Sequence, residues 1–509
     1  MKLLLPSSPS TTAIAIHSAV LHLRGGTSPH PQPFFDQRSS SCLAWNGELF
    51  GGEPMVPNDS NDGELLFERL ISNEGSSVLD VMDKTRGPFA MVYWDAPSQQ
   101  LWFGRDRLGR RSLVLGWDAA SRCLVISSNT VASSSDNHIQ WIELPADGMY
   151  CLDSNLLSSD GMHLNMEQLL ELDSIPATSA TLLDQAVIPM TIQDQSLPLY
   201  NAMYSSVKTR IESIPPNPHG PDAPRVGILF SGGIDCAVLA LLADRIVPAN
   251  EPIELFNVAF SNPNKSQQQP DRRFAVPDRV TGLNMLADLR RISPQRDWRF
   301  VSVDVELDEA KEWRNHIIQL MAPHDTAMDL SIALALWFAA RGRGTLTDGS
   351  AYIGQARVLL LGMGADEQFG GYSRHREAYR QGKWLRLLQE LQLDVSRISS
   401  RNLGRDDRII SDHAKEARFP FLDEDLVRFI SNLPVNAKMD VRFGRGIGEK
   451  LLLRYMAVRE LGMSVECASV AKRAIQFGAR TAKLDGAKEV GTDRVSLSYS
   501  FIQSEPMMS

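Results

Sequence analysis

Strand-like and helix-like apolar patterns alternate through the second half of the chain. The runs VGILF, IELFNVAF, RFVSVDV and RVLLLGMG are typical of buried strands, and the stretches between them carry apolar residues at helical spacing. Such alternation predicts parallel strands joined by crossover helices in a doubly wound α/β sheet. Because ligands bind beyond the carboxyl ends of such strands, the residues after VGILF and RVLLLG are the first candidates for chemistry.

The first part of the chain has a different pattern. Over residues 18–155, short runs of alternating apolar and aromatic residues are separated by Gly, Asn and Asp, and one helical stretch, DGELLFERLIS, interrupts them. We therefore expect a β-rich α+β domain over 1–155, a polar linker over 156–196, and the α/β domain over 197–485, opening with a helix over 197–211. We expect a poorly ordered tail over 486–509.

Composition narrows the function classes. The net charge of −9 gives no general attraction to nucleic acid or to an anionic membrane, and we expect neither partner. Five scattered cysteines without a CxxC pair predict reduced thiols and a cytoplasmic location. No apolar run is long enough to span a membrane. Prolines and Ser/Thr clusters break the apolar start over 1–20, which favours an irregular segment over a secretion signal.

The turn after VGILF has the residues of a phosphate-binding loop. Gly232 and Gly233 let backbone N–H groups face a ligand, and the helix that follows directs its positive N-terminus to the same place. Asp235 adds a carboxylate, which a phosphate would repel unless Mg²⁺ lies between them. The residues predict a polyphosphate site with Mg²⁺. The alternative is a tight βα turn that needs glycine for its geometry alone.

A second acid-bearing glycine turn follows RVLLLG. Asp366 and Glu367 come directly after it, and Arg374 follows within the same segment. If the two strands are adjacent in the sheet, Asp366 can share a metal ion with Asp235. The alternative is a charged, solvated helix start.

These segments together resemble the synthetase domain of the asparagine synthetases. SGGIDC resembles the SGGxDS loop of the N-type ATP pyrophosphatases, with Cys236 in place of the final serine. GMGADEQFGGYSR matches the pattern GxGxDExFGGYxR, and DDRIISDHAKEARFPFLD resembles the DR…EAR-PFLD segment. KRAIQFG resembles the lysine-bearing loop that faces the phosphates, with Lys472 as the matching lysine.

The first domain resembles the class II glutamine amidotransferases. WNGELF resembles their FNGEIYN segment at Asn46, Gly47 and Glu48, and Asp62 stands where the family holds the glutamine amino group. The resemblance as a whole is strongest to the asparagine synthetase domain-containing proteins of eukaryotes. It implies a partial α+β amidotransferase-type domain followed by an α/β PP-loop ATP-pyrophosphatase domain, of the adenine nucleotide alpha hydrolase-like class.

The resemblance also implies a reaction. The expected substrates are ATP with Mg²⁺, aspartate or a similar carboxylate, and glutamine or ammonia, and the family leaves room for a homodimer. The implied catalytic residues are Lys472, Asp235, Asp366 and Glu367, with Mg²⁺ on Asp235 and Asp366. The implied glutamine-binding residues are Asn46, Gly47, Glu48 and Asp62. The implied ATP- and pyrophosphate-binding residues are Leu229, Ser231, Gly232, Gly233, Ile234, Asp235, Cys236, Val258, Gly362, Met363 and Gly364.

Four of the residues that match the family patterns need a closer look. Val258 ends an apolar strand and is expected to form the adenine wall, although sheet core would explain it equally. Cys236 donates a weaker hydrogen bond than serine would. Arg408 and Arg418 are candidates either for binding a substrate carboxylate or for structural salt bridges.

Two departures from the family pattern bear on the reaction. The family's glutaminase uses an N-terminal cysteine, whereas here Lys2 follows Met1 and the first cysteine is Cys42, so glutamine hydrolysis is not expected from the residues as written. Met363 stands where the glutamine-dependent synthetases have a glutamate, and a thioether cannot transfer a proton. Two hypotheses follow: an ATP-dependent amidotransferase, or an ATP-binding pseudoenzyme with a regulatory or scaffold role.

Overall fold

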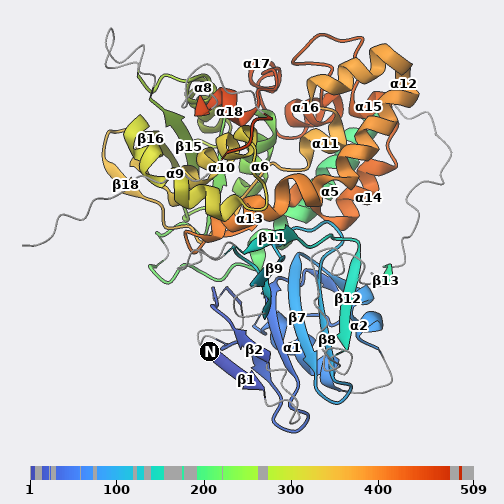
Figure 1. The fold of residues 1–509 in the computed structure, drawn as a ribbon. Coiled ribbons are helices and arrows are strands. Elements are labelled where there is room, and N and C mark those ends of the chain that lie inside the picture. Colours follow the sequence, from blue (N-terminus) through green and yellow to red (C-terminus); the bar gives the residue numbers. More distant parts are fainter. Residues whose placement is uncertain are drawn as a thin grey trace, which may run out of the picture.

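The computed structural model places two domains against each other (Figure 1). It describes residues 2–5, 14–21, 23–24, 30–57, 59–72, 77–118, 123–130, 139–153, 175–176, 192–220, 222–261, 273–481 and 492–495. Among these residues, no helix has the length and apolar character needed to cross a bilayer.

The α/β domain is built on a seven-stranded sheet in the order β18-β17-β16-β15-β14-β19-β20. The five strands from β16 to β20 in this order pair in parallel, and β17 and β18 extend the sheet in antiparallel fashion. The strands are β14 (Val226–Leu229), β15 (Ile253–Phe260), β16 (Trp298–Val305), β17 (Arg343–Thr345), β18 (Ala351–Ile353), β19 (Val358–Leu360) and β20 (Glu416–Arg418). The predicted doubly wound sheet is confirmed, since the parallel order runs outward from β14 in both directions.

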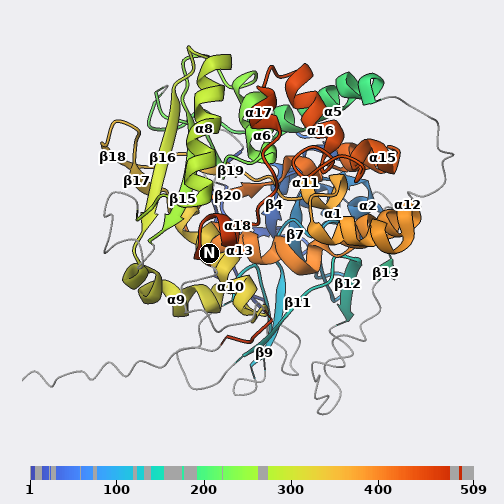
Figure 2. The ribbon, with the colours of Figure 1, turned by 90° about the horizontal axis from the view of Figure 1, so that it is seen from above.

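Helices cover both faces of this sheet. One apolar core joins β14 to α5 (Ile192–Glu212), α6 (Ile234–Asp244), α8 (Pro277–Ile292), α14 (Glu424–Ser431) and α16 (Leu451–Arg459). Another lies against α9 (Leu307–Met321), α10 (Ala327–Arg341) and α13 (Gly404–Ser411). Figure 2 looks down on this domain, with α8 lying along β15 and β16. β15 is buried along its whole length, including its two polar residues Glu254 and Asn257, as expected for a strand covered on both faces.

The remaining helices of the α/β domain are mostly short. They are α11 (Ala365–Phe369), α12 (Ser373–Ser396), the π-helical turn Ser399–Leu403, the 3₁₀ turn Pro420–Leu422, α15 (Val435–Lys438), α17 (Val465–Ala468) and α18 (Ile475–Gly478). α12 bends at Gly382 and Lys383, where the backbone leaves the helical region.

The first domain is a β-rich layer structure. A six-stranded sheet has the order β13-β12-β8-β7-β4-β3, and a three-stranded sheet has the order β10-β9-β11. α1 (Asp62–Ile71) and α2 (Val78–Lys84) pack on one face of the larger sheet around Phe67, Met82 and Phe89. The larger sheet comprises β3 (Phe34–Phe35), β4 (Cys42–Gly47), β7 (Phe89–Asp95), β8 (Gln100–Arg105), β12 (Gly148–Asp153) and β13 (Ile175–Pro176). The smaller elements are β5 (Gly51–Gly52), β6 (Thr85–Arg86), β9 (Val114–Asp118), β10 (Cys123–Ser127) and β11 (Gln140–Glu143).

Buried ion pairs join the two domains. Arg111 lies between β8 and β9 and binds Asp407 of α13 at 3.2 Å and Glu416 of β20 at 2.7 Å. Arg408 of α13 donates in return to Glu143 of β11 at 2.7 Å. These five charged groups are nearly removed from solvent, so the contact fixes the first domain against the amino-terminal ends of β19 and β20.

Two local expectations differ from the structure. The helix expected over 197–211 begins five residues earlier, at Ile192, and carries Pro198 in its second turn. The irregular start expected over 1–20 contains β1 (Lys2–Leu5), which pairs with β2 (Ile14–His17). The linker expected over 156–196 and the tail over 486–509 fall largely outside the described residues.

Candidate functional site

The turn between β14 and α6 forms an open cradle of backbone amides. Gly232 has φ +79°, and a Cβ there would lie 2.4 Å from the amide nitrogen of Gly282. Only glycine therefore allows this turn to pack against α8. Gly233 is the N-cap of α6 without a side-chain cap, and Thr281 fixes the turn from α8 by donating to the carbonyl of Ser231 at 3.0 Å.

Cys236 is turned into the first turn of α6 rather than toward a ligand. Its Sγ donates to the carbonyl of Gly233 at 3.1 Å and lies 3.8 Å from the hydroxyl of Ser231. Burial and the neighbouring Asp235 raise the pKa of the Cys236 thiol to about 11. The thiol is thus neutral at physiological pH and braces the loop, while the amides and the helix end remain the groups that face a ligand.

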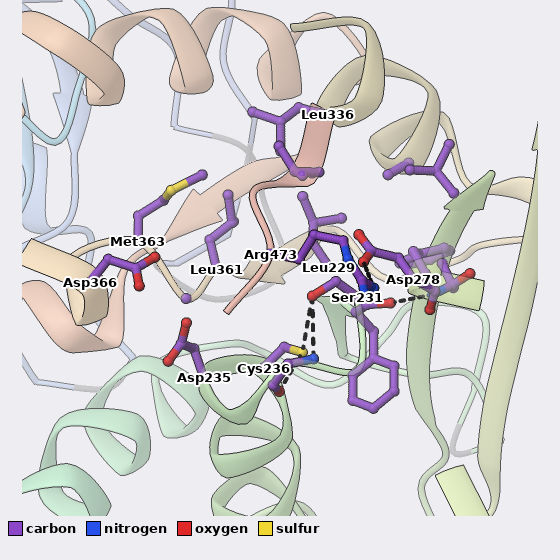
Figure 3. A pocket seen from close by; sticks show the side chains of 18 of the residues that line it. Leu229, Ser231, Asp235, Cys236, Asp278, Leu336, Leu361, Met363, Asp366 and Arg473 are labelled. Carbon is purple, nitrogen blue, oxygen red and sulfur yellow. Dashed lines mark hydrogen bonds and ion pairs between the residues drawn. The ribbon is translucent and has the colours of Figure 1, made fainter. Parts of the chain in front are cut away.

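The second acid-bearing turn lies directly beside the first. β14 and β19 are adjacent and parallel, with Ile228 opposite Leu360. A Cβ on Gly362 would lie 2.8 Å from the Cβ of Asp235, so glycine lets the two loops approach closely. Asp366 then projects from the first turn of α11. Figure 3 shows the carboxylates of Asp235 and Asp366 turned toward one another, as the sequence predicts.

Two lysines join these carboxylates. The Nζ of Lys450 lies 2.6 Å from Oδ2 of Asp235 and 2.6 Å from Oδ1 of Asp366, and Lys472 pairs with Oδ2 of Asp366. Burial alone would raise the pKa of Asp366, but the two ammonium groups hold that pKa well below its usual range. Asp366 is therefore ionised at any physiological pH.

Lys450 is a site residue that the sequence reasoning missed. It precedes α16 in the stretch GRGIGEKLLL, which shares no feature with a strand-end loop. Three glycines followed by a lysine ahead of a helix were the available signal, but such a run also fits an ordinary surface turn.

A pocket opens above the two loops (Figure 3). Ten of the predicted residues line it: Leu229, Ser231, Gly233, Asp235, Cys236, Val258, Gly362, Met363, Asp366 and Lys472. Four do not: Ile234 lines the adjoining basic pocket, and Gly232, Gly364 and Glu367 line neither pocket. Apolar residues Phe256, Leu336, Leu361 and Ile475 complete the upper wall, which suits an aromatic base.

The adjoining pocket is strongly basic. Lys450, Arg454, Lys472 and Arg473 line it together with Ser231, Gly233, Ile234, Asp235, Asp278, Thr281, Val470 and Ala471. It shares the amide cradle, Lys472 and Arg473 with the apolar pocket, which Lys450 does not line. The arrangement therefore offers an apolar chamber for a base and a basic chamber for a polyanion on either side of one loop.

Both carboxylate oxygens of Glu367 accept hydrogen bonds from within its own segment. Its Oε1 accepts a hydrogen bond from the Tyr372 hydroxyl at 2.6 Å, and its Oε2 accepts one from the amide of Gly364 at 3.1 Å. Burial and the charge of Asp366 raise the pKa of Glu367. Glu367 thus fixes the carboxylate loop and Tyr372, and its catalytic role stays a prediction.

The two facing aspartates fit a divalent cation. Both supply hard oxygen ligands, and both approach a single cationic nitrogen within 2.7 Å, so they converge on one point. Among the described residues, no group of three or more His, Cys, Asp and Glu side chains forms a complete metal cage. A cation held here would take its other ligands from phosphate oxygens and water, which is the usual pattern for Mg²⁺ bound with a nucleotide.

The predicted glutamine residues lie together in a cavity between the domains. Asn46, Gly47, Glu48 and Asp62 line it, as does Arg24, which the sequence reasoning did not single out. Asp62 accepts from the amides of Leu49 and Gly63 at 2.8 and 2.9 Å. Burial and the charge of Asp62 raise the pKa of Glu48 to about 8, so Glu48 is largely protonated at neutral pH.

The two candidate substrate arginines serve the structure instead. Arg408 is fully buried and donates to Glu143, to Ser112 and to the carbonyl of Leu320. Arg418 is also buried, and donates to Glu416 at 2.7 Å and to the carbonyl of Arg210. Neither guanidinium lines either of the two pockets at the strand ends.

Comparison with known proteins identifies the family of both domains. The profile of the asparagine synthase family matches residues 379–466, and that of a glutamine amidotransferase domain matches residues 26–133. The chain is 35% identical to human asparagine synthetase domain-containing protein 1, over 93% of this chain and 89% of that protein. It is 36% identical to asparagine synthetase domain-containing protein YML096W of Saccharomyces cerevisiae, over 94% and 86% respectively. A putative glutamine-hydrolysing asparagine synthetase of Methanocaldococcus jannaschii is 26% identical over 44% of this chain and 36% of that protein.

Proposed function

This chain belongs to the asparagine synthetase domain-containing proteins, and from that premise we propose that it is an ATP-dependent ligase that activates a carboxylate. The carboxylate oxygen attacks the α-phosphorus of ATP, the bond between the α-phosphorus and its bridging oxygen breaks, and pyrophosphate leaves. Ammonia then displaces AMP from the acyl carbon to form an amide. Aspartate, giving asparagine, is the first substrate to test.

One observation supports this proposal above the others. Asp235 and Asp366, from loops at the ends of adjacent parallel strands, face each other beside an amide cradle, the buried Lys450 and the half-buried Lys472. A structural turn would not need this convergence of charge, because each buried charge is costly unless it is paired. Attack on the α-phosphate gathers negative charge on phosphate oxygens, and such an arrangement counters that charge.

Different residues of the site would bind the different parts of ATP and its Mg²⁺. The apolar wall that includes Val258 and Leu361 would hold the adenine ring, and the amides after Ser231 would hold the phosphates. Lys472 borders both pockets and would neutralise the bridging phosphate oxygens as pyrophosphate departs. Asp235 and Asp366 would hold Mg²⁺, which when bound draws electron density from the phosphate oxygens and stabilises the leaving pyrophosphate.

We propose that ammonia is the nitrogen donor and that glutamine binds in a second cavity. Asn46, Gly47, Asp62 and Arg24 border one cavity with the polar groups that an amino acid amide requires. This cavity reaches Glu416 of β20, whose strand pairs with β19 of the carboxylate loop. The arrangement is consistent with a nitrogen donor bound at the far end of the same sheet.

A second function is favoured by one residue. Met363 lines the pocket beside Asp366, where proton removal from ammonia would occur, and it cannot accept a proton. A missing general base typically slows a reaction by roughly a hundredfold to ten-thousandfold. The chain would then bind ATP while serving a regulatory or scaffold role.

The two functions are separated by product analysis. Purified protein is incubated with ATP, Mg²⁺, aspartate and ammonium, and both pyrophosphate and asparagine are measured, with Asp235→Ala as the control. Asparagine formed by the wild type and not by the variant supports the ligase. Bound ATP without either product contradicts the ligase for aspartate and supports the binding role.

A further inference from the structure

Lys450 occupies the point on which the two aspartates converge. Its Nζ lies 2.7 and 2.6 Å from the two carboxylate oxygens of Asp235 and 2.6 Å from Oδ1 of Asp366. Its side chain is only 1% exposed. An ammonium ion and a divalent cation would therefore compete for the same oxygens.

The surrounding backbone is shaped to hold the lysine there. Lys450 has φ +56°, in the left-handed region that a side chain with a Cβ rarely adopts, and its amide is held by the carbonyl of Phe369 at 3.0 Å. A Cβ on Gly371 would lie 2.7 Å from the Cε of Lys450 and would overlap the Asp366 carboxylate. Strain of this kind persists only where the surroundings over-determine it, and here the ion pairs do so.

The charge balance of the cluster decides what it can accept. Asp235 and Asp366 carry two negative charges, and Lys450 and Lys472 carry two positive charges, so these four groups have no net charge. A divalent cation added alone would leave a buried excess of positive charge, which is costly at low dielectric. A divalent cation added together with a polyphosphate would not, because the phosphate charges balance it.

We propose that Lys450 is a built-in competitor of the divalent cation, which keeps bare metal out of the site and admits metal only together with a polyphosphate. On loading, the ammonium leaves the carboxylates and binds phosphate oxygens in the basic pocket that it also lines. The polyphosphate half of this proposal rests on the proposed function. The competition between the two cations rests on the geometry of Lys450, Asp235 and Asp366 alone.

The test measures metal binding without nucleotide or substrate. Mn²⁺ binding to the full chain is titrated by the electron paramagnetic resonance signal of the free ion, for the wild type and for Lys450→Met. Removal of the ammonium leaves two converging carboxylates, so we expect Mn²⁺ to bind the variant at least about tenfold more tightly. Lys438→Met is the matched control: Lys438 is a similarly buried lysine, 6% exposed, that donates to the carbonyl of Ser431. It should leave Mn²⁺ binding unchanged.

Lys450→Gln provides a second variant if the apolar substitution prevents folding, since it keeps N–H donors toward the carboxylates without the charge. A gain in Mn²⁺ affinity with either folded variant, and not with Lys438→Met, supports the proposal. Equal Mn²⁺ affinity in the wild type and both Lys450 variants overturns it. The result is independent of ATP: if the variants gain Mn²⁺ but the wild type never binds ATP, the proposed function fails and the competition stands.

Discussion

Asp278 is a buried carboxylate that borders both chambers of the site. It lies at the start of α8, and burial raises its pKa to about 7, against the attraction of Arg473 and Lys472. The Asp278 carboxyl group is therefore about half protonated near neutral pH. A group with a raised acid pKa is also a source of instability once it ionises.

We predict that Asp278→Asn stabilises the protein in a pH-dependent manner. The unfolded carboxyl ionises near its ordinary value of 3.8, whereas the folded one ionises at about 7. Between those values the folded state binds more protons than the unfolded state, so wild-type stability falls as pH rises through this window. The variant should match the wild type near pH 4 and exceed it by about 2–4 kcal/mol at pH 8. Urea denaturation at several pH values measures this, and a constant difference at all pH values would contradict it.

The phosphate loop gives a second prediction at this scale. Gly232→Ala places a Cβ 2.4 Å from the Gly282 amide at φ +79°, so both clash and backbone strain oppose it. We expect a loss of at least about 2 kcal/mol in the free energy of unfolding. Gly220→Ala is the control, because Gly220 also has positive φ (+107°) but has no atom within 4 Å of an added Cβ. Equal losses in both variants would show that strain alone, and not the contact with α8, demands glycine.

At the scale of elements, the loop between β8 and β9 fastens the two domains through Arg111. Its guanidinium pairs with Asp407 and Glu416 and also donates to the carbonyl of Ala417 at 3.0 Å. Removing one partner of such a network leaves carboxylates buried without compensation. Breaking a buried pair in this way is far more costly than replacing the whole pair with apolar groups.

We therefore predict that Arg111→Met costs about 3–5 kcal/mol of stability. Arg107→Met provides the control, because Arg107 lies in the same loop but pairs with Asp83 at the surface, with its side chain 54% exposed. That variant should change stability by less than about 1 kcal/mol. Chemical denaturation compares the two, and similar small losses would mean that the buried network contributes little.

The elements of the sheet were predictable because their patterns are local. β14 is a short apolar run, and α6 follows its glycine loop directly, so the local pattern was enough to place Asp235 at a strand end. The pairing of β14 with β19 was only an expectation, since they are separated by more than a hundred residues. The start of α5 at Ile192 was not predictable from its polar first turn and Pro198.

At the scale of the whole molecule, the fold brings together residues that no sequence window contains. Lys450 reaches the aspartates only because α16 packs beside α11. Arg408 and Arg418 were ambiguous in the sequence because a substrate-binding arginine and a structural one look alike. The contacts of Arg408 with the first domain settle its role, and they depend on how the domains pack.

The same packing links the two pockets through one strand. Glu48 borders the cavity between the domains and lies 3.5 Å from Arg418 of β20. The carbonyl of Arg418 accepts a hydrogen bond at 3.0 Å from the amide of Leu361, which lines the pocket beside Met363. The two pockets are thus connected through contacts of a single strand, β20.

Exchange of labelled pyrophosphate into ATP tests carboxylate activation most directly, because it requires no amide formation and therefore no base at Met363. The wild type is incubated with ATP, Mg²⁺, labelled pyrophosphate and aspartate, with Lys472→Ala in parallel. We predict label in ATP that depends on aspartate and is lost in the variant, since Lys472 borders both the base and the phosphate chambers. Tight binding of ATP without any aspartate-dependent exchange would contradict activation of aspartate and leave a nucleotide-binding role.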